Sequence, residues 1–192
     1  MFPADKLTAS GGEIYCHLFE NPQAGVPRNA YWSIRIDFHP IHYEGQDWRC
    51  SMTCEWLTWP LRDWRELSGR SLNLNYGDRG SEASFYMCEH DLGKSTRLNI
   101  GPRAGSSFDV AMEMVVDFAG YTGTDENPAM VVRGRATVPY YTGVIVVPDN
   151  LSSRPNTPTE VSSAVAAYLD TMLLKAPERR SHAFWMEPMA GI

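Results

Sequence analysis

The sequence predicts an α+β fold: a mainly antiparallel, twisted β-sheet of about eight strands with one C-terminal amphipathic helix. Apolar and polar residues alternate along most of the stretch from Trp32 to Val147, and the apolar spacing becomes helical after Pro148. Alternation is typical of strands with one buried and one wet face, as in antiparallel sheets. Such a sheet can fold into a sandwich or a half-barrel, and both arrangements remain open.

The alternation is clearest in three segments. Their apolar residues are Trp32, Ile34, Ile36 and Phe38; Trp48, Cys50, Met52, Cys54 and Trp56; and Phe108, Val110, Met112, Met114, Val116 and Phe118. Because successive side chains on a strand point to opposite faces, each segment is predicted to cover the core with one face.

The other strands are predicted from shorter runs that are bounded by turn-forming residues. In chain order, we predict strands at residues 12–19, 31–38, 48–58, 72–76, 83–89, 96–100, 108–118, 130–138 and 143–147. Residues 21–29 are predicted to form a loop, and residues 76–80 and 101–105 short links, because they are rich in glycine, proline or both.

The length of 192 residues fits a single domain with a core that needs no disulfide support. Within residues 1–192 we predict a loose N-terminal lead-in at 1–11, a β-rich body at 12–147, a helix at 157–174 and a C-terminal tail at 176–192. Residues 61–67, with charged side chains around Trp64, are predicted to form a short helical turn between sheet segments.

The helix begins with the pattern of a capping box. Thr157 is the expected N-cap, Pro158 occupies the first helical position, and Glu160 reaches back to the N-cap. The apolar residues that follow at helical spacing, and that we expect to be buried, are Val161, Val165, Leu169 and Met172. The tail contains Phe184, Trp185, Met186 and Met189, so it is predicted to pack back on the domain or to dock on a partner.

The formal net charge of −6 disfavours nucleic acid and anionic membranes as partners. The first residues lack the pattern of a signal peptide, and no stretch approaches the roughly 18 apolar residues of a membrane span. The sequence therefore predicts a cytoplasmic protein without a membrane partner.

The four cysteines, at positions 16, 50, 54 and 88, do not predict disulfides. Cys50 and Cys54 lie on the apolar face of one predicted strand, so we expect them to be buried, reduced and free of metal. A zinc site formed by these two cysteines with His39 and His42 is the alternative, but the spacing is not that of a zinc finger or ribbon. No cofactor is predicted.

Gly93, Lys94 and Ser95 resemble the end of a phosphate-binding loop. The motif also requires a glycine at position 88, which is cysteine here, and a helix immediately afterwards, where a strand pattern follows. We therefore interpret this segment as a polar hairpin tip.

Catalysis is considered at Glu89, His90 and Asp91, which follow a predicted strand, with His39 as a further candidate. Alternation sends Glu89 and Asp91 to one side and His90 to the other, so the three do not form a triad without a bend. No Gly-x-Ser-x-Gly motif accompanies them. We assign no catalytic residue and keep these four as the alternative.

Two hypotheses about function remain. The first is an acidic binding protein, such as an immunity protein or an inhibitor of a basic toxin or nuclease, because acidic surfaces attract basic partners. Its predicted contacts are the carboxylates of Asp37, Glu55, Glu113 and Asp117, with Trp59 or Trp64 as the aromatic anchor. The second is a small-ligand-binding protein or a hydrolase-like enzyme with a pocket near His90.

Overall fold

The computed structural model describes residues 2–78, 80–87, 90–117 and 129–190. Their main element is a mixed sheet of eleven strands in the order β10-β9-β8-β7-β5-β2-β1-β11-β13-β12, with β6 also paired to β8. The strands are β1 (Ala9–Asn21), β2 (Val26–Phe38), β5 (Ser51–Leu57), β6 (Ser71–Asn75), β7 (Glu82–Tyr86), β8 (His90–Ala104), β9 (Ser107–Val116), β10 (Met130–Pro139), β11 (Gly143–Val146), β12 (Glu178–Arg180) and β13 (Ala183–Met186). A separate hairpin contains β3 (Ile41–Tyr43) and β4 (Gln46–Trp48).

The predicted α+β class and the mainly antiparallel pairing agree with this architecture, although the sheet has eleven strands rather than about eight. Among the described strands, β1 and β11 form the one parallel pair, with Tyr15 opposite Gly143. This pairing brings the C-terminal part of the chain onto the sheet beside β1.

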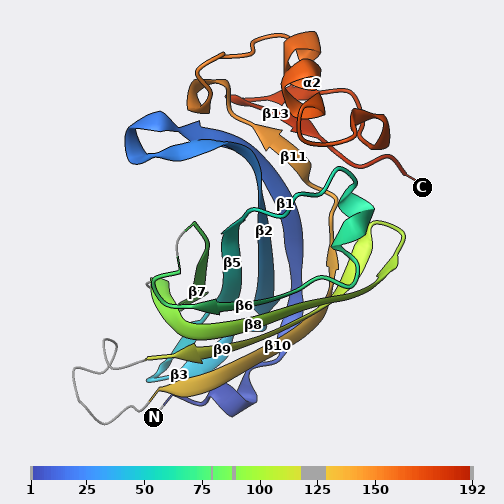
Figure 1. Ribbon diagram of the computed structural model, residues 1–192. Helices are drawn as coiled ribbons and strands as arrows, with labels where there is room; N and C mark the ends of the chain where they lie inside the picture. Colours follow the sequence, from blue (N-terminus) through green and yellow to red (C-terminus); the bar gives the residue numbers. More distant parts are fainter. Residues whose placement is uncertain (1, 79, 88–89, 118–128, 191–192) are drawn as a thin grey trace.

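The sheet bends along β8. The first residues of β8 pair with β7, and its residues from Ser95 to Asn99 pair with β6, while a register shift against β9 falls between Gly93 and Ser95. Figure 1 shows β6, β8, β9 and β10 running across β1, β2 and β5. At Gly134 of β10 an added Cβ would lie 3.0 Å from Cγ2 of Ile36, so the two parts of the sheet meet face to face.

The inner faces of the two parts enclose one hydrophobic core. Alternate residues of the strands supply it, as predicted from the alternation; Ile14, Ile34, Met52, Phe108 and Val110 are examples, each fully buried. Cys50 and Cys54 are buried in the same core, which confirms the predicted burial.

Several predicted boundaries were wrong. The expected loop at 21–29 is reduced to a turn around η2 (Pro22–Ala24), because the Asn21 side chain accepts a hydrogen bond from the Ala24 backbone N–H (3.2 Å) and both strands continue to it. The expected strand at 48–58 is interrupted between Trp48 and Ser51. The expected link at 101–105 lies largely in β8, and positions 88, 89 and 118 of the predicted strands lie outside the described residues.

The N-terminal segment is not the loose lead-in that we predicted. Phe2 is buried and makes edge-to-face contacts with the rings of Tyr43 and Phe85, at centroid distances of 5.6 and 5.9 Å. η1 (Ala4–Lys6) follows, and β1 already begins at Ala9. The predicted helical turn near Trp64 is confirmed as η3 (Trp64–Leu67).

The helix α2 (Pro158–Ala166) has the predicted capping box, in which Thr157 and Glu160 exchange hydrogen bonds. It ends before the predicted residue 174. The Arg62 guanidinium donates hydrogen bonds to the carbonyls of Ala166 and Ala167, at 3.0 and 2.8 Å. It thereby provides partners for carbonyls at the helix end, which have none within the helix.

The chain then turns into η5 (Thr171–Leu173), where the Asp170 side chain accepts a hydrogen bond from the Met172 N–H (2.9 Å). Val161, Val165 and Leu169 are buried as predicted. The predicted burial of Met172 was wrong: its side chain is 81% exposed, because the helical path on which the prediction rested ends before it.

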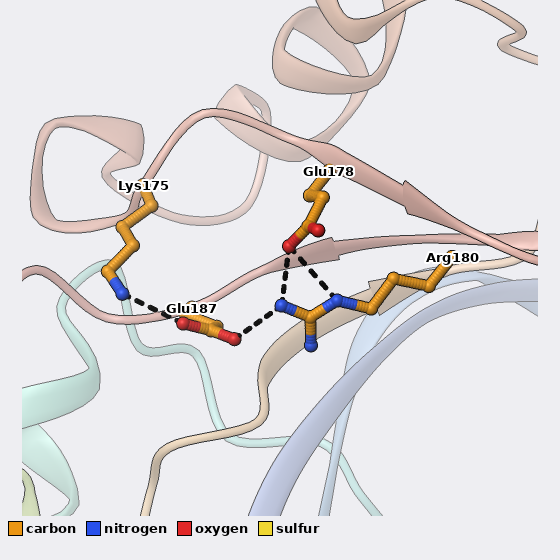
Figure 2. A network of polar contacts seen from close by, with 4 residues as sticks. All are labelled: Lys175, Glu178, Arg180 and Glu187. Atoms are coloured by element: carbon orange, nitrogen blue, oxygen red, sulfur yellow. Dashed lines mark hydrogen bonds and ion pairs between the residues drawn. The ribbon is translucent and has the colours of Figure 1, made fainter.

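The C-terminal tail packs back on the domain. Its strand β13 pairs with β11 and buries Phe184 and Met186, and β12 adds a further strand beyond it. Figure 2 shows the charged network that ties this part together: the Glu187 carboxylate lies between Lys175 Nζ (2.8 Å) and the Arg180 guanidinium (2.6 Å), which also binds Glu178.

Replacing Leu169 by Ala is expected to lower the free energy of unfolding by about 2–5 kcal/mol, because the side chain fills a core site. The matched replacement Met172→Ala is expected to change it by less than about 0.5 kcal/mol, because Met172 is exposed. Denaturant titration measures both, and equal effects would show that the segment after α2 docks differently.

Gly143, at the start of β11, is expected to tolerate no side chain. Its φ is +68° and an added Cβ would lie 2.0 Å from the carbonyl oxygen of Met186 on β13. Gly105 has a similar φ of +62° but open space around the added atom. We expect Gly105→Ala to cost about 1–2 kcal/mol for the backbone conformation alone, and Gly143→Ala about 3 kcal/mol or more. Thermal or denaturant unfolding tests the order, which equal losses would contradict.

Candidate functional site

A β-bulge lies on the central strands of the sheet. Trp32 of β2 is opposite Leu57 of β5, and Ile34 is opposite Cys54, so Glu55 and Trp56 together face the single residue Ser33. Trp56 has a φ of +60°. A bulky residue rarely adopts this conformation, which costs on the order of 1–3 kcal/mol.

The bulge places Trp56 in a cluster of three aromatic rings. Its ring lies 5.1 Å from that of Phe19 and 5.6 Å from that of Tyr31, and the Phe19 and Tyr31 rings are 6.3 Å apart. The Ser81 hydroxyl donates a hydrogen bond to the Trp56 carbonyl (3.4 Å), and the Tyr31 hydroxyl donates to the Pro27 carbonyl (2.7 Å). We call Phe19, Tyr31 and Trp56 the aromatic cluster.

Two hollows flank the aromatic cluster, and all three rings line both of them. The first has a volume of about 200 Å³ and is also lined by His17, Ser33, Glu55 and Ile145. The second has a volume of about 810 Å³ and is also lined by Val26, Pro27, Thr58 and Glu82. Aromatic walls with a few polar groups are the usual composition of small-molecule sites.

Polar side chains of the first hollow come from β1, β2 and β5, and Asn150 of η4 (Pro148–Asn150) adds one more. Tyr15, which is directly opposite Ser33, donates a hydrogen bond from its hydroxyl to Oε1 of Glu55 (3.3 Å). Burial, and then the charge of Glu55, raises the pKa of Tyr15, so its hydroxyl stays protonated and able to donate. The His17 ring lies 5.1 Å from that of Tyr15, and burial lowers the pKa of His17, which favours the neutral imidazole.

Glu55 is the one predicted contact residue found in this site. The carboxylates of Asp37, Glu113 and Asp117 are each paired with a cation of the same chain, Arg35 (3.0 Å), Arg133 (2.7 Å) and Lys94 (2.7 Å) respectively.

Of the two predicted anchors, Trp59 is partly buried at the edge of the core. The expectation that Trp64 offers a surface anchor was wrong, because it is only 2% exposed. Its ring packs against Tyr140 (5.4 Å) and Phe108 (6.2 Å) in the core.

The residues considered for catalysis do not gather around a pocket. His90 is exposed at the start of β8, with Nδ1 3.4 Å from the Ser84 hydroxyl, and neither hollow includes His90, Asp91 or His39. His39 follows β2, three strand positions from β8, which corresponds to roughly 14 Å. Glu89 lies outside the described residues.

The cysteines and histidines of the zinc alternative are also apart. Cys50 and Cys54 are four residues apart along an extended segment, about 13 Å, whereas both sulfurs of a zinc site lie about 2.3 Å from the metal. Burial raises the pKa of Cys54 to about 12, which disfavours the thiolate that a metal needs. Within the described ranges, no three His, Cys, Asp or Glu residues are grouped to hold a metal ion.

The Gly93-Lys94-Ser95 segment lies inside β8, so it is neither a phosphate-binding loop nor the polar hairpin tip that we predicted. Its neighbours on both sides are strand residues, because β8 is long enough to pair with both β7 and β6. The Lys94 ammonium is paired with Asp117.

Comparison with family models finds no match to this chain, and neither the search among curated proteins nor that among solved structures returns a significant match. No helix in the part of the chain that the structure describes is both long and apolar enough to cross a membrane. The site must therefore be interpreted from its own geometry.

The sequence analysis did not identify Tyr15, His17, Phe19, Tyr31, Ser33 or Trp56 as site residues. A usable signal was present on β1, where Tyr15, His17 and Phe19 alternate with the buried Ile14, Cys16 and Leu18. Two aromatic side chains and a histidine on the outer face of a strand are unusual for a purely solvated surface. The alternation predicts Trp56 on the core face, because it does not reveal the bulge.

The lowered pKa of His17 predicts a pH dependence of stability. Below its ordinary value of 6.5 the unfolded chain takes up the proton before the folded protein does, so stability is lost as pH falls through and below 6.5. We expect His17→Gln to flatten this slope in denaturant titrations between about pH 7 and 5. The control His39→Gln, at an exposed position, is expected to leave it unchanged; the opposite pattern would contradict the burial of His17.

Proposed function

We propose that the protein binds a small ligand in the two hollows beside the aromatic cluster. The observation that carries this proposal is Trp56, a bulky residue at φ +60° in a bulge, with its ring lining both hollows. Strained backbone and bulges are concentrated at binding and catalytic sites, where they redirect a side chain.

The polar groups favour binding over catalysis. The Glu55 carboxylate accepts its hydrogen bond from the Tyr15 hydroxyl, which lies on the strand position opposite Ser33. A hydrolase requires a nucleophile next to a general base, and the described residues of the first hollow do not provide that pair. Glu55, Ser33 and His17 instead supply polar groups that would orient a ligand against the rings in the first hollow.

The hypothesis of an acidic protein-binding surface receives less support from the geometry. It requires carboxylates that are available to a basic partner, yet Asp37, Glu113 and Asp117 are already paired within the chain. Such a surface would use Trp59 as its anchor, and Trp59 lines neither hollow.

Binding can be tested by screening a fragment library with ligand-observed NMR and repeating the screen on Trp56→Gly. Glycine accepts the positive φ at this position, so the variant removes the ring without straining the backbone. We expect the fragments that bind the native protein to weaken at least about tenfold in Trp56→Gly, as the ring supplies much of the contact.

The matched control is Trp59→Ala, which removes an indole outside the two hollows and is expected to leave fragment binding unchanged. A screen without binders, or binders that depend on Trp59 and not on Trp56, would contradict the proposal. Dependence of a captured basic protein on Trp59 and Glu55 would favour the protein-binding hypothesis instead.

A further inference from the structure

Among the described residues that line the two hollows, the side chains that carry a formal charge at neutral pH, leaving histidine aside, are all carboxylates. Glu55 lines the first hollow and Glu82 the second, and the two are directly opposite each other on β5 and β7. No Lys or Arg is among the described residues that line either hollow. Neither carboxylate forms an ion pair with a lysine or arginine of the described chain.

This arrangement differs from two other cross-strand pairs of the sheet. There the register places a carboxylate opposite a cation: Glu113 and Arg133 on β9 and β10, and Glu13 and Arg35 on β1 and β2. Like charges directly opposite each other on neighbouring strands are destabilising. The Glu55–Glu82 pair is thus a position at which an added positive charge would relieve repulsion.

The aromatic cluster supplies the other half of a cation site. Ring faces carry partial negative charge and attract ammonium groups within about 6 Å of the ring centroid, tryptophan most strongly. Burial raises the pKa of Tyr31, and its hydroxyl donates to the Pro27 carbonyl, so the phenol is held neutral with its polar end outside the cluster. A group bound in either hollow would contact the aromatic surface that the rings present there.

From these observations we infer that the ligand is an organic cation, an amine or quaternary ammonium compound, whose charged group lies against Trp56 between Glu55 and Glu82. The inference rests on the proposed function, since it names the ligand class of the same two hollows. The rings would contact the alkyl surface of the ammonium group, and the two carboxylates would balance its charge at longer range.

The test compares two pairs of probes that share a shape and differ in charge: choline with 3,3-dimethylbutan-1-ol, and benzylamine with benzyl alcohol. The indole N–H resonance of Trp56, assigned by its loss in Trp56→Gly, reports binding in NMR titrations. In each pair we expect the cation to bind about tenfold more tightly than its neutral counterpart and to move this resonance.

Two substitutions that change the net charge by the same amount separate a local effect of Glu82 from an effect of the overall charge of the protein. Glu82→Gln removes a carboxylate beside the hollows, and Glu113→Gln removes one that is paired with Arg133. We expect Glu82→Gln to reduce the preference for the cation at least about threefold and Glu113→Gln to leave it within error. Equal reduction by both would mean that the preference reflects overall charge, which overturns the inference.

The outcomes for the cation and for the site are distinguishable. If the neutral probes bind at Trp56 as tightly as the cations, or if fragments bind there and no cationic probe does, the ligand class is wrong while the proposed binding function stands. If neither the probes nor the fragment library move the Trp56 resonance, both are wrong.

Discussion

The alternation of side chains between the two faces of β1, β2 and β5 is the constraint on which both the core and the candidate site depend. The inner face is filled by the core, including Ile14, Ile34 and Cys54. One extra residue in β5 shifts the phase of this alternation, because a one-residue slip sends each following side chain to the opposite face. Leu57 thereby occupies the core position that Trp56 would have taken, and the indole turns out to the other face.

The parts of the fold that could be predicted are those determined by local pattern. Phe108 to Val116 alternate without interruption and form β9, and the capping box at Thr157 begins α2 where expected. The parts that could not be predicted depend on pairing between distant segments. A strand at 143–147 and a tail that packs back were among the expectations, but their partners were not. The parallel pairing of β1 with β11 and the pairing of β13 with β11 and β12 leave no signal in the local sequence pattern. The end of α2 likewise depends on Arg62, which is remote in sequence.

The pairing of charges at the site also depends on contacts between distant segments. The net charge of −6 indicated an acidic surface, but composition does not tell which carboxylates are left without a cation. The register decides this: Glu113 meets Arg133, whereas Glu55 meets Glu82. Of the residues predicted from acidity, Glu55 alone lies in the hollows, and it was identified for its charge rather than for its neighbours Tyr15 and Trp56. Solvated ion pairs on the other strands contribute little to stability, typically below about 1 kcal/mol each.

The backbone conformation at position 56 does not explain why this residue is tryptophan, since glycine or asparagine would adopt a φ of +60° with less strain. The strain is on the order of 1–3 kcal/mol, a sizeable part of the roughly 5–15 kcal/mol by which domains are stable. Ring contacts with Phe19 and Tyr31, worth about 0.5–1.5 kcal/mol each, offset it to a similar extent. The apolar surface that the partly buried indole removes from water adds to these contacts. The strained backbone at Trp56 thus lies where its side chain borders both hollows, and the proposed binding site depends on this position.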